Sequence, residues 1–141
     1  YDIRSRQAAR RAAEMIDSSD RLQPVTVETR RGVEQLMRIL ETLARVELTD
    51  GLTFAQLVTE TASRLPRDAT VLAILGSVSD ETAVTLGSLH RQGYAVTVIL
   101  NVYGMHDFEV GAGRLLAEGI ETRHLQDMAS IGTLCRDYVL R

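Results

Sequence analysis

In the first 66 residues, apolar positions recur every three or four residues, the spacing that places them on one side of a helix. This spacing predicts three helices, over residues 4–16, 30–45 and 54–65. Thr53 and Gln56 form a capping box that starts the third helix, and Pro66 ends it. Residues 25–27, which follow Pro24, are a candidate for one short strand. This part of the chain is therefore expected to be mainly helical.

From residue 67 onward the pattern changes to continuous apolar runs of strand length, which are typical of parallel strands buried on both faces. The predicted strands cover residues 70–75, 94–101 and 121–125, the last being more polar. Helical segments alternate with them, at 81–91, 107–118 and from Asp127 to about residue 140. Such alternation implies right-handed crossovers on one parallel sheet. The expected fold is α/β, a Rossmann-like three-layer sandwich in one domain over residues 1–141, with three β-α units over residues 67–141.

Composition narrows the class of protein. The 141 residues are 25% charged with a net charge of −3, which disfavours nucleic acid as a partner. All 16 basic residues are arginines, so Schiff-base and P-loop lysine chemistry are excluded. The single cysteine, Cys135, lies in an apolar helical pattern and is expected to be a buried thiol.

No apolar run has the length of a membrane span and no secretory signal is present, so a cytoplasmic protein is expected. Because the chain opens at Tyr1 without a methionine, it is expected to be a fragment of a longer protein.

Polar residues follow the first two predicted strands, where the carboxyl ends of parallel strands form a binding edge. The candidate ligand-binding residues there are Ser77, Ser79, Asp80, Asn101, Tyr103 and His106. Residues 76–79 read Gly-Ser-Val-Ser, which is not the Gly-x-Ser-x-Gly of a nucleophile elbow, and Ser79 or Asp80 is explained as a helix cap. His106 beside Asp107 resembles a base with its orienting carboxylate, but Asp107 is also well placed to be a helix N-cap. No catalytic residue is therefore assigned.

The sequence also argues against common cofactors. Three scattered histidines and one cysteine do not have zinc-ligand spacing. Only Gly76 lies in the turn where a dinucleotide fingerprint needs three glycines. No cofactor is expected.

From residue 30 onward the chain resembles the C-terminal part of a bacterial family called domain of unknown function 58. The segments that carry the resemblance are RRGVEQLMRILETLARVEL, TDGLTFAQLV, RLPRDATVLAIL, RQGYAVTVILNV and LAEGIETRHL. Members of this family contain a von Willebrand factor A-like domain and are often encoded beside MoxR-type ATPases. The resemblance therefore implies a von Willebrand factor A-like fold and a MoxR-type ATPase as a partner.

The resemblance also bears on metal binding, because von Willebrand factor A domains hold a metal ion with three loops. Residues 51–53, Gly-Leu-Thr, match the second loop and would place Thr53 among the ligands. In the third loop the aspartate is missing at Gly76 and Ser77, and the first loop is not in this chain. Thr53 and Ser77 alone would not hold a hard cation, so no metal is expected.

Two functions remain open. The first is a noncatalytic protein-interaction domain; the alternative is a small-ligand-binding domain or hydrolase that uses the crevice at the strand ends.

The resemblance also implies that residues 70–75 lack a neighbouring strand and leave an unpaired apolar edge. Residues 25–27 could cover that edge, or two chains could meet, and we expect a homodimer formed edge to edge or by exchange of the N-terminal helices.

Overall fold

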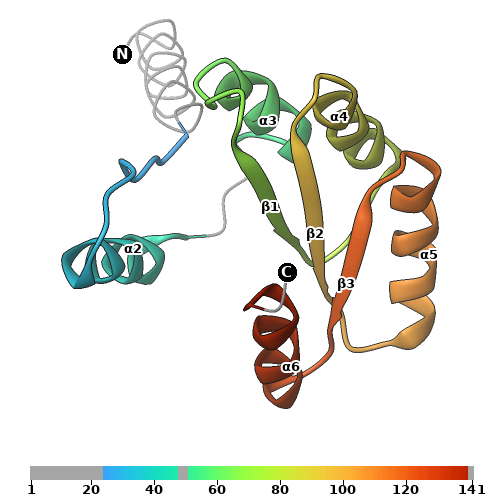
Figure 1. The fold of residues 1–141 in the computed structure, drawn as a ribbon. Helices are drawn as coiled ribbons and strands as arrows, with labels where there is room; N and C mark the ends of the chain where they lie inside the picture. The colour runs from blue at the N-terminus through green and yellow to red at the C-terminus, as the bar shows by residue number, and fades with distance from the viewer. Residues whose placement is uncertain (1–23, 48–50, 140–141) are drawn as a thin grey trace, which may run out of the picture. The chain divides into compact units, whose positions relative to one another are not determined.

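The computed structural model describes residues 24–47 and 51–139 (Figure 1). The contacts within the chain divide it into two compact units, Tyr1–Leu57 and Val58–Arg141. The helix predicted over residues 4–16 lies outside the described residues.

Helix α2, Val33–Arg45, confirms the helix predicted from residue 30, with a later start. Its N-cap is Gly32, whose positive φ of 100° breaks the helical path that residues 30 and 31 were expected to begin. Residues 24–31 form no strand, so the strand predicted at residues 25–27 is wrong. A strand exists only where its backbone groups pair with a neighbour, and no described residue pairs with this segment.

Helix α3, Phe54–Ala62, begins with the predicted capping box. The Thr53 amide donates to Gln56 Oε1 at 2.9 Å, and the Gln56 amide donates to Thr53 Oγ1 at 3.2 Å. The helix ends three residues before the predicted position, because tight turns replace it ahead of Pro66. The Arg64 amide bonds the Thr61 carbonyl at 2.9 Å in the first of these turns. A residue before proline is disfavoured in the helical conformation, which explains the early end.

The second unit contains the predicted parallel sheet. Its three strands are β1 (Thr70–Leu75), β2 (Ala95–Asn101) and β3 (Glu121–Leu125), in the order β1-β2-β3. Both pairs are parallel, with Thr70 opposite Ala95 and Thr97 opposite Glu121. The α/β class and the parallel sheet are therefore confirmed, and the arrangement is compatible with a Rossmann-like sandwich.

Three helices alternate with the strands: α4 (Asp80–Arg91), α5 (Met105–Ala117) and α6 (Met128–Val139). Ser79 caps α4 as predicted, since its Oγ accepts from the Thr82 amide at 3.1 Å. Asp127 caps α6 as predicted, with Oδ1 2.9 Å from the Ser130 amide.

The N-cap predicted for α5, Asp107, is wrong. The first helical hydrogen bond of α5 already runs from the Phe108 amide to the Gly104 carbonyl at 3.1 Å, so the N-cap is Gly104. Gly104 has extended backbone angles and the chain turns into the helix directly after it. Asp107 therefore lies in the first turn, where a carboxylate still interacts favourably with the helix dipole.

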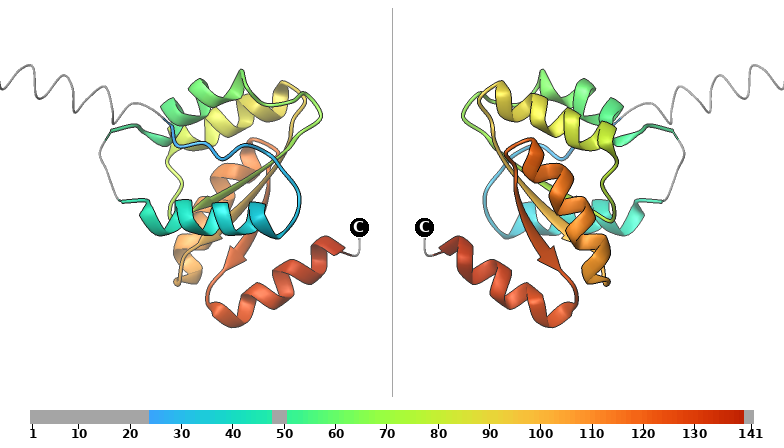
Figure 2. Two further views of the ribbon diagram at one scale, coloured as in Figure 1. Left: turned by 90° about the vertical axis from the view of Figure 1, so that its left-hand side faces the viewer. Right: turned by 90° about the vertical axis from the view of Figure 1, so that its right-hand side faces the viewer.

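The helices cover the two faces of the sheet unequally. Helices α4 and α5 lie on one face, and α6 lies on the other, against β3 (Figures 1 and 2). Right-handed crossovers between strands in the order β1-β2-β3 put α4 and α5 on the same face, which is why the core forms there. The buried apolar residues of this core are Ala73, Val78, Ala83, Leu86, Leu89, Val96, Val98, Leu100, Leu115 and Ile120.

Because the helices cover the two faces of the sheet unequally, two expectations from the sequence are wrong. Strand β1 is not buried on both faces, because Leu72 is 48% and Ile74 63% exposed on the face away from α4 and α5. Cys135 is exposed and not a buried thiol. In the described part of this unit, α6 packs against β3 only, so much of its apolar surface has no neighbour.

Candidate functional site

The predicted binding edge contains a cavity of about 460 Å³ at the carboxyl ends of β1 and β2. One wall is the loop Gly76, Ser77 and Val78, which follows β1. The opposite wall is a face of α5 that includes His106 and Arg114. Parallel strands place these segments together because their carboxyl ends share one edge.

Two of the predicted ligand residues, Ser77 and His106, line this cavity, and Asp107 joins them. His106 and Asp107 are both exposed. No hydrogen bond is found between the side chains of Ser77, His106 and Asp107 in the described part of the chain. The three side chains therefore do not form, in this structure, the hydrogen-bonded nucleophile, base and orienting group that acyl transfer uses.

Ser79 and Asp80 are used locally. The Ser79 hydroxyl caps α4 and lies 3.0 Å from the Thr82 hydroxyl. Asp80 Oδ1 forms an ion pair with Arg114 Nε at 2.9 Å. Both residues therefore hold the loop after β1 in place, and neither lines the cavity.

Arg114 is the cavity residue that the sequence interpretation missed. Its Nη1 donates to the Val78 carbonyl at 2.5 Å, in addition to the ion pair with Asp80. One guanidinium thus connects α5 to the loop after β1. The sequence did contain a sign that Arg114 belongs to this cavity, because Asp107, Gly111 and Arg114 follow one another at helical spacing and share a face of α5.

Gly111 allows α5 to approach the sheet closely. A Cβ added there would lie 2.9 Å from Leu100 Cδ1 and 3.7 Å from Val78 Cγ2. Gly111 therefore sets the distance between α5 and β2 at the cavity.

Asn101 and Tyr103 do not line the cavity. The loop that carries Tyr103 is held by the residue after β3, since Gln126 Nε2 donates to the Tyr103 carbonyl at 3.2 Å. His124 Nε2 lies 2.8 Å from the Val102 carbonyl, and its ring stacks on Phe108 with centroids 4.3 Å apart. These contacts make the loop after β2 a structural junction.

Thr53 belongs to the other unit, where its hydroxyl caps α3. Among the residues that the structure describes, no three His, Cys, Asp or Glu side chains are grouped as metal ligands would be. Asp80, two residues after the cavity loop, is paired with Arg114.

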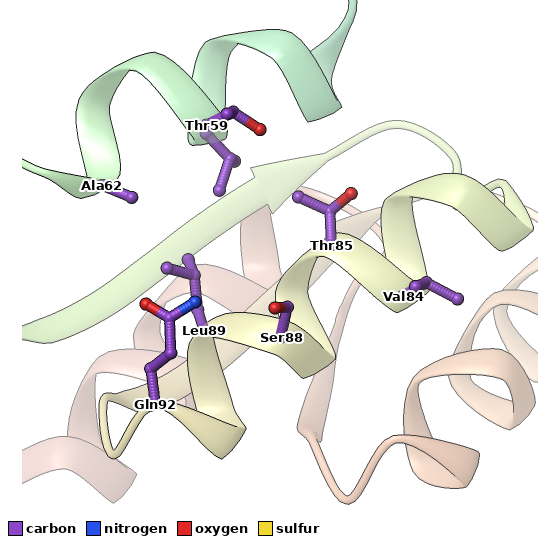
Figure 3. A pocket seen from close by; sticks show the side chains of 8 residues that line it. Thr59, Ala62, Val84, Thr85, Ser88, Leu89 and Gln92 are labelled. Carbon is purple, nitrogen blue, oxygen red and sulfur yellow. The ribbon is translucent and has the colours of Figure 1, made fainter.

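A second cavity of about 460 Å³ lies between α3 and α4 (Figure 3). Uncharged side chains, most of them small, line this cavity. Thr59 and Ala62 face Thr85, Ser88 and Leu89 across it (Figure 3). No titratable side chain lines it, so it offers apolar contacts and hydroxyl groups but no acid-base chemistry.

Helix α2 of the first unit carries an exposed apolar stripe. Its apolar residues at three- and four-residue spacing are Val33, Leu36, Met37, Leu40 and Leu43, all exposed. None of its 13 residues is buried. An amphipathic helix whose apolar stripe is open is suited to lie in a hydrophobic groove of another protein.

No helix in the described ranges has both the length and the apolar content to cross a membrane. Comparisons of the chain with protein-family models, curated proteins and solved structures found no match.

Proposed function

We propose that this chain is a noncatalytic protein-interaction domain of the von Willebrand factor A-like type, and that a MoxR-type ATPase is its partner. The observation that carries the proposal is the exposed apolar stripe of α2. The fold supports the type, because three parallel strands alternate with helices and the capped turn at Thr53 starts a helix. The ATPase rests on the resemblance described above.

The stripe has the anchors that helix-in-groove recognition uses. Leu36, Leu40 and Leu43 recur at helical spacing, and the opposite side of α2 is polar, with Arg38 and Thr42. Binding energy at such interfaces is concentrated in a few apolar anchors near the centre. Leu36 and Leu40 are central in this stripe.

The test is calorimetric titration of the full chain with the MoxR-type ATPase from the same genome. Leu36→Glu with Leu40→Glu is expected to weaken binding by about 2 kcal/mol or more, roughly 30-fold in Kd. The control is Thr42→Glu, which adds one negative charge on the polar side of α2 and should leave Kd unchanged. Absence of binding, or equal affinity of the double variant, would refute the proposal.

A second candidate function is small-ligand binding or hydrolysis at the strand-end cavity. The observation that favours it is the placement of Ser77 and His106 in one cavity of about 460 Å³, a volume within the range of ligand pockets. Turnover of a generic phosphate or ester substrate that His106→Ala abolishes would establish it over the interaction domain.

The domain also offers a second kind of protein contact, self-association as a homodimer. Its basis is the edge of β1, which pairs with β2 alone among the described strands.

A further inference from the structure

We infer that two copies of this chain join through β1, antiparallel about a two-fold axis at Ala73, and so continue the sheet from one copy into the other. This contact concerns the edge of the sheet and does not require the ATPase or α2. The inference rests on the chemistry of β1, on its contrast with β3, and on the register that its side chains permit.

Strand β1 has the properties of an edge that receives another strand. It pairs with β2 on one side over all six residues, without a bulge. On its other side no described residue bonds to it. Its sequence, TVLAIL, contains no charge and no proline. Natural sheets protect exposed edges with charges, prolines or bulges, and β1 has none of these.

The opposite edge of the same sheet is protected. Strand β3 has five residues and carries Glu121 and Arg123, whose side chains pair at 2.9 Å. Charged side chains on a short strand hinder the addition of another strand. The contrast indicates that β1, and not β3, is the edge that associates.

The pleat of the strand restricts the register. Leu72 and Ile74 point to the exposed face, whereas Val71, Ala73 and Leu75 point toward α4 and α5. Residues opposite one another in an antiparallel pair share a face, so the two-fold axis must pass beside a residue. An axis beside Ala73 puts Leu72 opposite Ile74 of the second copy, twice by symmetry.

The apolar character of the opposed residues favours an axis at Ala73 over an axis at Leu72. With the axis at Ala73, residues 71–75 of both copies face one another and every pair is apolar. With the axis at Leu72, Thr70 would face Ile74, and Leu75 would face Ala69 at the end of the strand.

A second copy is favoured over an unrelated strand because the edge is complementary to itself. Its antiparallel pairing brings no like charges together, because the strand TVLAIL carries no charge, and it puts apolar residues opposite one another. Cross-strand contact between Leu72 and Ile74 also covers part of the apolar surface that remains open in one copy.

The first experiment is sedimentation equilibrium of the full chain at micromolar concentration. Twice the 15.6 kDa mass is expected for the native chain. Ile74→Lys places a charge on the edge and should restore the single mass. The matched control, Leu116→Lys, makes the same change at an exposed position of α5 and should remain a dimer. A monomeric native chain, or a dimer insensitive to Ile74→Lys, would overturn the inference.

The second experiment tests the register and does not depend on the folding of a charged variant. In a Cys135→Ser background, Leu72→Cys and Ile74→Cys are oxidised separately and as an equimolar mixture. Opposed residues lie about 4.5–5.5 Å apart between Cα atoms, within the reach of a disulfide. Covalent dimer is expected only in the mixture. Equal cross-linking of either variant alone, or none in the mixture, would refute the register. Loss of the dimer with retained ATPase binding would leave the proposed function standing.

Discussion

Two adjacent leucines of α5 allow a sharp test of how the second unit is stabilised. Leu115 is 0% exposed and Leu116 is 75% exposed, although they have the same side chain in the same helix. Replacing each with alanine changes helix propensity by the same small amount. The difference between the two variants therefore isolates burial against the sheet.

The expected magnitude follows from the structure. Leu115→Ala removes a fully buried side chain and leaves a cavity beside β2 and β3, which costs about 2–5 kcal/mol. Leu116→Ala removes contacts mainly with water, and the free energy of unfolding should change by no more than about 0.5 kcal/mol.

Urea denaturation followed by circular dichroism measures both variants. With a slope of about 1–3 kcal/mol per molar urea, a loss of about 3 kcal/mol lowers the Leu115→Ala midpoint by about 1–3 M. The Leu116→Ala midpoint should remain close to that of the native chain. Equal losses for both variants, or a larger loss for Leu116→Ala, would refute the assignment of α5 to the covered face of the sheet.

Three further predictions concern the ends of helices. Ser79→Ala removes the cap on the Thr82 amide and should lower the free energy of unfolding by about 0.5–2 kcal/mol in thermal denaturation, whereas Ser79→Asp should retain most of it. Gly119 has φ of 75°, so Gly119→Ala should cost about 1–2 kcal/mol in urea denaturation; an unchanged midpoint would contradict this. The hydrogen bond from the Ser130 hydroxyl, followed by that from the Ser130 amide, lowers the pKa of Asp127 below its usual 3.8. Because the folded pKa is the lower one, this cap stabilises the fold above pH about 3.8 and its contribution is lost as the pH falls through the folded pKa. Carboxyl titration by NMR should show the lowered midpoint and its rise in Ser130→Ala; a native midpoint at 3.8 would exclude the effect.

Features that depend on near neighbours in the sequence were predictable. The capping box of Thr53 and Gln56, the Ser79 cap and the Asp127 cap each need only residues one turn apart. The strand β1 has the predicted bounds because a continuous apolar run between polar segments defines a strand of this kind. The parallel arrangement then follows from the alternation of strands and helices.

The candidate site was predicted only in part. The shared edge of the parallel strands placed Ser77 and His106 in one cavity as expected. Arg114 was missed because it lies ten residues beyond Gly104, the last residue before α5, and only the helical path returns it to the loop after β1. Asn101 ends β2 and Tyr103 lies in the loop after it, yet contacts from His124 of β3 and from Gln126 decide the position of this loop.

Interactions of short range made the elements from α2 onward, the caps at Thr53, Ser79 and Asp127, and the parallel class of the sheet predictable from the sequence. Only the tertiary structure decided which surfaces are open. An apolar run such as residues 70–75 reads the same whether one or both of its faces are covered, and the order of the strands settles the matter by placing α4 and α5 on one side. Leu72 and Ile74 are exposed for this reason. Cys135 is exposed because α6 meets a single strand in the described part of its unit.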